Sequence, residues 1–76
     1  MVTDEFELQA RYDARKSFYG KAHVIVENDG DDLYLRSYNT RVAHIHEGKR
    51  VPNEEIWASA TTNRHIREFY KQFEEV

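Results

Sequence analysis

The sequence predicts an α+β fold: a small antiparallel β-meander of three to five strands with one C-terminal α-helix packed on one face. Two glycine-centred turn signals, residues 28–32 and 47–49, separate short runs rich in β-branched residues, as expected of a meander. Near the C-terminus, apolar side chains recur at the spacing of one helix face, at Ile66, Phe69, Tyr70 and Phe73. The 76 residues suffice for a single domain, residues 1–76.

The N-terminal stretch, residues 1–16, is predicted to be a strand or an extended arm. Apolar and polar residues alternate between Phe6 and Tyr12, which is the period of a half-buried strand. A short helix that begins after Asp4 is the alternative, because Phe6 and Ala10 would then share one helical face.

The meander itself is predicted over residues 21–57. Its strands are expected at residues 21–27, 33–38 and 41–46, with a fourth segment at 51–57. Pro52 argues that this last segment lies at a sheet edge or starts irregularly. The C-terminal helix is predicted over residues 61–75, with hydroxyl side chains for its N-cap at Ser59, Thr61 and Thr62.

A helix can cover only one face of such a sheet, so the alternation along each strand decides which side chains are buried. The covered face is expected to carry Leu33, Leu35, Ala43 and Ile45, completed by Val24 or Ile25. The opposite face is expected to carry Tyr34, Arg36, Tyr38, Thr40, His44 and His46. Its mixture of polar and aromatic groups is typical of a binding surface rather than of a solvated sheet.

Composition narrows the classes of function. The 11 basic and 14 acidic residues give a net charge of −3, which disfavours direct nucleic-acid binding because phosphate neutralisation supplies much of that affinity. The sequence contains no cysteine, which favours an intracellular location over secretion. The longest apolar run, residues 24–26, is too short to span a membrane. No nucleophile motif or phosphate-binding glycine loop occurs in the sequence, so we do not expect an enzyme.

Two histidines raise the question of a metal site. His44 and His46 stand two residues apart and therefore on one face of a strand, a spacing used in some metal centres. His23 or Glu27 could supply a third ligand from a neighbouring strand. A polar face with two half-buried histidines is the more common arrangement, so we predict no metal and no other cofactor.

The start of the helix is a candidate anion-binding site formed by Thr61, Thr62 and Arg64. Free N–H groups at a helix N-terminus attract phosphates and acidic side chains. The ordinary interpretation is a capping motif, with Arg64 paired to a carboxylate and His65 packed on the sheet rim. Trp57, just before the helix, is expected to cap the core rather than to anchor a partner.

Several spaced motifs resemble a known family. They are Leu35-x-Ser37-Tyr38-Asn39-Thr40-x-Val42-Ala43-x-Ile45, then Trp57, then Ser59-x-Thr61-Thr62-x-Arg64-His65-Ile66-x-Glu68-Phe69. With the upstream segment 15–22, they are similar to a family of small uncharacterised proteins of phages, prophages and other mobile elements, over residues 15–73. Tyr70-Lys71 departs from the family pattern, where leucine and a polar residue are common, and this should affect packing only.

The resemblance implies a phage or mobile-element accessory protein that acts in the cytoplasm of a host bacterial cell, although the family has no settled activity. Small proteins in that setting often inhibit host defence complexes, and anti-CRISPR proteins are the best-known case. We therefore expect a non-enzymatic protein that binds and inhibits or modulates a host protein complex, with a CRISPR effector as the leading example.

The predicted partner surface consists of Tyr34, Arg36, Tyr38 and His44, with acidic Asp29, Asp31 and Asp32 at its edge. An acidic edge suits a partner with a basic nucleic-acid channel. An exposed edge strand is also compatible with a homodimer. The alternative function is a small nucleic-acid-binding module, in which tyrosines stack on bases and the cations contact phosphates. Its candidate residues are Arg36, Arg41, Lys49, Arg50, Tyr34 and Tyr38.

Overall fold

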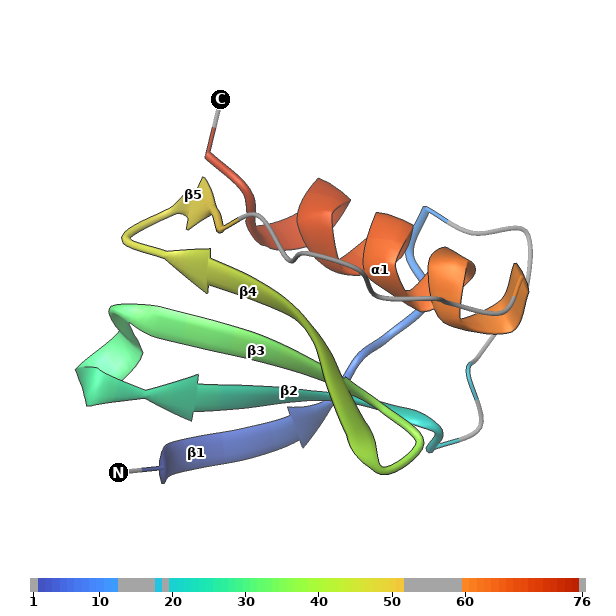
Figure 1. Ribbon diagram of the computed structural model, residues 1–76, viewed down its shortest axis with the longest axis horizontal. Coiled ribbons are helices and arrows are strands. Elements are labelled where there is room, and N and C mark those ends of the chain that lie inside the picture. Colours follow the sequence, from blue (N-terminus) through green and yellow to red (C-terminus); the bar gives the residue numbers. More distant parts are fainter. Residues whose placement is uncertain (1, 13–17, 19, 52–59, 76) are drawn as a thin grey trace.

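The computed structural model describes residues 2–12, 18, 20–51 and 60–75. It contains an antiparallel sheet whose strands follow the order β1-β2-β3-β4-β5, and one helix that lies across a single face of that sheet (Figure 1). The elements are β1 (Val2–Glu7), β2 (Ala22–Glu27), the 3₁₀ turn η1 (Asn28–Gly30), β3 (Asp32–Ser37), β4 (Thr40–His46), β5 (Lys49–Arg50) and α1 (Ala60–Phe73). The predicted α+β meander with one C-terminal helix is confirmed.

The N-terminal segment forms strand β1, which pairs with β2 in antiparallel register. The strand interpretation of the alternating pattern is therefore confirmed, and the alternative of a helix after Asp4 is wrong. The alternation continues past the end of β1, because Leu8 donates its N–H to the carbonyl of Ala22 at 2.9 Å and its side chain is fully buried. Burial of one leucine of this kind stabilises the fold by about 1.5–3 kcal/mol.

The turn between β4 and β5 explains why residue 48 is a glycine. Glu47 and Gly48 both adopt positive φ angles, 49° and 82°. Two consecutive residues of this kind form the tight hairpin turn whose twist matches that of the flanking strands, and glycine adopts the second position without strain.

The core lies between the sheet and α1. Leu35, Ala43 and Ile45 are buried there as predicted, and Leu33 packs against them. Val24, which pairs with Leu35, completes this face, whereas Ile25 points to the opposite face. From the helix, Phe69 is fully buried, and the other stripe residues pack against the same cluster: Ile66, Tyr70 and Phe73.

Polar side chains also tie α1 to the rest of the fold, which the apolar stripe did not predict. The Ser37 hydroxyl lies 2.8 Å from His65 Nδ1 and 3.2 Å from Thr62 Oγ1, and these atoms are buried. Glu68 Oε1 accepts a hydrogen bond from the Tyr12 backbone N–H at 2.8 Å. These contacts fix the helix to the chain segment after β1 and to the end of β3.

The region after β4 departs from the prediction. The strand β5 comes before the predicted segment 51–57, and Val51 donates its N–H to the carbonyl of His44 at 2.9 Å. Pro52, Trp57 and Ser59 lie outside the described residues, so the expectations for them stay predictions.

Candidate functional site

Figure 1 shows α1 over one face of the sheet, and the strand register places most of the predicted partner residues on the opposite face. The strand register places on it Glu5, Glu7, His23, Ile25, Glu27, Asp32, Tyr34, Arg36, Arg41, His44 and His46. We call this set the open face, because no helix or strand of the described residues lies over it. Tyr34 stands near its middle, opposite Ile25 on one neighbouring strand and His44 on the other.

An aromatic stack lies at the centre of the open face. The rings of Tyr34 and His44 are nearly parallel, 9° apart, with centroids separated by 4.2 Å. The guanidinium carbon of Arg41 lies 4.4 Å from the Tyr34 ring centroid, and its Nη1 is 2.7 Å from Glu27 Oε2. Cation–π contact and the ion pair hold Arg41 against the tyrosine.

The remaining arginine of the open face is also paired. Arg36 Nη1 lies 3.4 Å from Glu5 Oε1. Ile25 lies on β2, between the strands that carry Glu5 and Arg36. Its side chain is only 5% exposed, even though it points away from the helix. The open face is therefore an ordered layer of side chains that covers part of the sheet.

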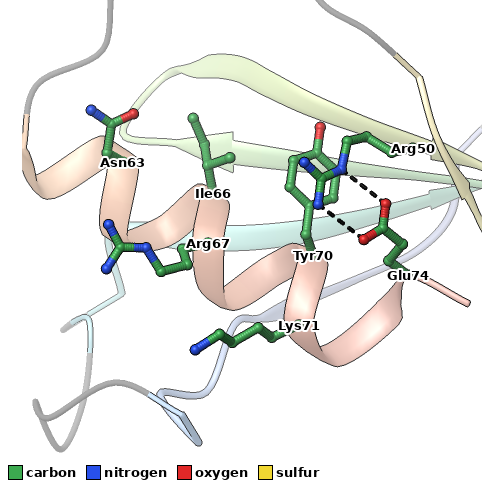
Figure 2. A pocket seen from close by; sticks show the side chains of 7 residues that line it. All are labelled: Arg50, Asn63, Ile66, Arg67, Tyr70, Lys71 and Glu74. Carbon is green, nitrogen blue, oxygen red and sulfur yellow. Dashed lines mark hydrogen bonds and ion pairs between the residues drawn. The ribbon is translucent and has the colours of Figure 1, made fainter. Parts of the chain in front are cut away.

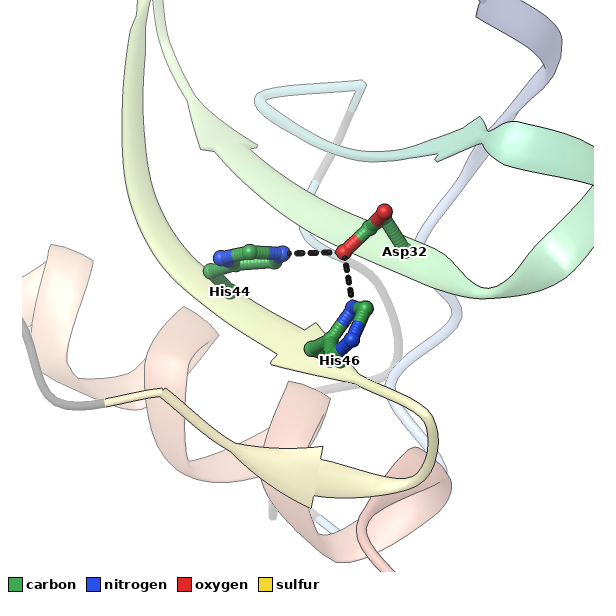
Figure 3. Close-up of side chains that lie close together, drawn as sticks. All are labelled: Asp32, His44 and His46. Atoms are coloured by element: carbon green, nitrogen blue, oxygen red, sulfur yellow. Dashed lines mark hydrogen bonds and ion pairs between the residues drawn. The ribbon is translucent and has the colours of Figure 1, made fainter.

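Asp32, His44 and His46 meet at one corner of the open face (Figure 3). Asp32 Oδ1 accepts a hydrogen bond from His44 Nε2 and another from His46 Nδ1, each at 2.7 Å. Asp32 Oδ2 accepts a third from the Asn28 side-chain amide at 2.6 Å. The Asn28 amide and then the two imidazoles hold the pKa of the Asp32 carboxyl far below its ordinary value. The hydrogen bond to Asp32 in turn raises the pKa of His46.

The sequence pattern placed Asp32 with Asp29 and Asp31 in the turn over residues 28–32, and for Asp32 this is wrong. Asp32 is the first residue of β3 and is buried, whereas Asp29 and Asp31 are exposed beside the open face. The register of β3 with β4 places Asp32 directly opposite His46. A signal existed in the sequence, because a hairpin that pairs Tyr34 with His44 must also pair Asp32 with His46.

The two predicted third ligands for the histidines are engaged elsewhere. His23 Nε2 lies 2.9 Å from the carbonyl of Gly20, and Glu27 is bound to Arg41. Asp32 is the acidic neighbour of the histidine pair instead.

Tyr38 and Thr40 do not join the open face. Tyr38 begins the turn between β3 and β4 with a φ of 57°, and its ring centroid lies 6.1 Å from that of His65 on α1. A register shift between Leu35 and Arg36 then reverses the expected alternation in β4. As a result Arg41, rather than Thr40, pairs with Arg36 and points to the open face.

The predicted anion site at the helix start is not assembled. Thr62 points into the protein and contacts Ser37, while Thr61 and Arg64 are exposed. His65 is buried against Phe18, with ring centroids 4.6 Å apart, so it belongs to the core rather than to a rim. The three candidates therefore do not converge on one ligand position.

A hollow between α1 and β5 was not predicted (Figure 2). Its lining consists of Arg50, Asn63, Ile66, Arg67, Tyr70, Lys71 and Glu74. Within it, Arg50 donates two hydrogen bonds of 2.9 Å to the Glu74 carboxylate and lies 4.0 Å from the Tyr70 ring centroid. The hydrogen bonds to Glu74 raise the pKa of Arg50, and burial raises that of Tyr70. These contacts join β5 to the helix and give Arg50 a structural role.

No helix of the described residues has the length and apolar character needed to cross a membrane.

Comparison with known proteins places the chain in one family. No curated protein and no solved structure matches the chain. A family model described as a family of unknown function, DUF8033, matches residues 6–76, which include strands β2 to β5, the helix and the last two residues of β1. The chain therefore belongs to the DUF8033 family of proteins of unknown function.

Proposed function

We propose that this protein is a non-catalytic phage or mobile-element accessory protein that docks on a host protein complex through its open face. The observation that carries the proposal is the ordered layer around Tyr34, which no helix or strand of the described residues covers. Aromatic and arginine side chains held in place by neighbours are the usual anchors of protein interfaces. Their order before binding reduces the conformational entropy lost on association.

The charge of this surface points to a basic partner. Arg36 and Arg41 are each paired with a glutamate of the same face. The exposed Asp29 and Asp31 add two carboxylates beside it. An acidic surface of this kind complements a protein that binds nucleic acid in a basic channel. CRISPR effectors have such channels, and the resemblance to mobile-element proteins supports a host defence complex as the target.

The nucleic-acid alternative has weaker support. Three of its four candidate cations, Arg36, Arg41 and Arg50, each make an ion pair with a glutamate. Phosphate binding would have to break these pairs or compete with the nearby carboxylates. Tyr38, one of its two stacking candidates, lies away from Tyr34 at the β3–β4 turn.

Capture from a bacterial host lysate tests the proposal when matched variants are compared. The tagged wild-type chain should retain a nucleic-acid-binding protein complex, and the polyanion heparin should release that complex by competition for its basic surface. Tyr34→Ala should lose the captured complex. Tyr12→Ala is the control, since Tyr12 is 62% exposed and lies outside the open face.

Three results would contradict the proposal. One is equal capture by the Tyr34 and Tyr12 variants, and another is capture that heparin leaves unchanged. The third is direct binding of the purified chain to DNA or RNA with a steep salt dependence, which would support the alternative.

A further inference from the structure

One corner of the open face holds a set of metal-ligand atoms. Asp32, His44 and His46 each offer one such atom, and the three atoms lie within 4.8 Å of one another. Figure 3 shows both imidazole rings directed at the same carboxylate oxygen. Two imidazoles and one carboxylate, with coordination positions left for water, are a common donor set for zinc and related divalent metals.

We propose that Asp32, His44 and His46 bind one divalent transition-metal ion of the zinc class. The proposal stands on side-chain geometry and is independent of the docking function. It also revises the sequence-based expectation that no metal is bound, because Asp32 was not among the third ligands considered there.

The surroundings orient each ligand, as in established metal sites. The Asn28 amide binds Asp32 Oδ2 and leaves Oδ1 directed at the two imidazoles. The stack on Tyr34 fixes the plane of the His44 ring. Glu47 Oε1 lies 4.0 Å from His46 Nε2, on the side of the ring away from the carboxylate. A hydrogen on Nε2 would face this second carboxylate once Nδ1 coordinates a metal.

The geometric change needed for binding is small. In a tetrahedral zinc site with bonds of about 2.0–2.2 Å, neighbouring ligand atoms lie about 3.3 Å apart. The two imidazole nitrogens are now 2.7 Å from Asp32 Oδ1, so modest side-chain rotations would open the space for an ion. Each coordinating nitrogen must then be free of hydrogen: a protonated ring would release that proton to solvent, and a neutral ring would carry its hydrogen on the other nitrogen instead.

Access comes from the solvent side. The Asp32 side chain is 9% exposed, that of His44 22% and that of His46 52%, so exposure increases from the carboxylate outward. An ion would enter past His46 and keep water on its open side. The same open side is where a side chain from a docked protein could complete the coordination.

Calorimetric titration of chelator-treated, dialysed protein with Zn²⁺ tests the site. The wild type should bind one equivalent of Zn²⁺. His46→Gln should weaken binding by at least about 10-fold, because loss of a ligand costs more than loss of an outer partner. His23→Gln is the matched control, since His23 lies on the same face but bonds to Gly20, and it should bind Zn²⁺ as the wild type does.

Nuclear magnetic resonance provides a second readout. Zn²⁺ should shift the ring signals of His44 and His46 and leave those of His23 and buried His65 unchanged. Because His46 is exposed, His46→Gln should fold, and its amide spectrum verifies this. The proposal is overturned if the wild type takes up no Zn²⁺, if His46→Gln binds as tightly as the wild type, or if His23 is the histidine that responds.

Discussion

His44 stacks on Tyr34 across the β3–β4 pair and also donates a hydrogen bond to Asp32. One histidine thus joins the aromatic centre of the open face to its acidic corner. The contacts continue to Arg41 on one side and His46 on the other. Because these groups already hold one another in place, a partner would meet a surface that needs little rearrangement.

Charge beside the open face should control the rate of association with a basic partner. Asp31→Lys adds positive charge at an exposed position and should slow association with the captured complex, with a smaller effect at high salt. Surface plasmon resonance measures both rates. Asp4→Lys is the control, since exposed Asp4 lies opposite Val26 on the far edge of the sheet. Equal slowing by the two variants would show that net charge alone acts.

The apolar core should depend on Phe69 more than on any exposed ring. Phe69 is fully buried, so Phe69→Ala should lower the free energy of unfolding by about 3–5 kcal/mol. Phe6 is 40% exposed and its ring centroid lies 6.2 Å from that of Phe73, so Phe6→Ala should lower the free energy of unfolding clearly less. Urea unfolding followed by circular dichroism measures the free energy of unfolding of both variants. Similar losses of stability in the two variants would contradict the placement of Phe69 at the centre of the core.

The helix stripe and the strands were predictable because each depends on a local period along the chain. A burial period near 3.6 residues from Ile66 to Phe73 requires a helix against an apolar surface, and turn residues define the strand ends. The alternation along each strand, which buries Leu35 and Ile45, was predictable in the same way. These features need no knowledge of which residues meet across the sheet.

The site was less predictable because it depends on register. The shift between Leu35 and Arg36 changes the alternation of β4, and the positive φ of Tyr38 turns its ring toward the helix. Neither irregularity has a local signal as clear as a glycine or a proline. Asp32 was misplaced for a similar reason, because its polar side chain beside a turn looks solvated until the pairing with His46 is known.

The link between β5 and α1 should make a modest contribution to stability. Arg50 pairs with Glu74 and lies over Tyr70, but its side chain is 52% exposed, so solvent weakens the ion pair. Arg50→Ala should lower the free energy of unfolding by about 1 kcal/mol, the combined scale of an exposed pair and a cation–π contact. The neighbouring exposed Lys49→Ala should change it by less than about 0.5 kcal/mol. A larger loss for Lys49 than for Arg50 would contradict this assignment.

In metal-free protein, the contacts of Asp32 should make stability depend on pH in two directions. The pKa of Asp32 is lowered on folding, so its contribution is present above its unfolded value of about 3.9 and is lost as pH falls through the folded value. The pKa of His46 is raised, so its contribution is present below about 6.5 and is lost as pH rises through the folded value.

The stability difference between wild type and His46→Gln should therefore be largest between about pH 4 and 6.5 and should shrink toward alkaline pH. Thermal unfolding in a chelating buffer measures it. A difference that grows as pH rises above neutrality would show that His46 does not gain its proton affinity from Asp32.

Site-specific photo-crosslinking in a bacterial host tests the docking surface most directly. A photoreactive p-benzoylphenylalanine is introduced at Tyr34 in one variant and at exposed Tyr12 in another. Irradiation of cells should crosslink position 34, but not position 12, to a component of a nucleic-acid-binding protein complex. Crosslinks from position 12 alone, or from position 34 to nucleic acid rather than to protein, would contradict the proposal that the open face docks on a host complex.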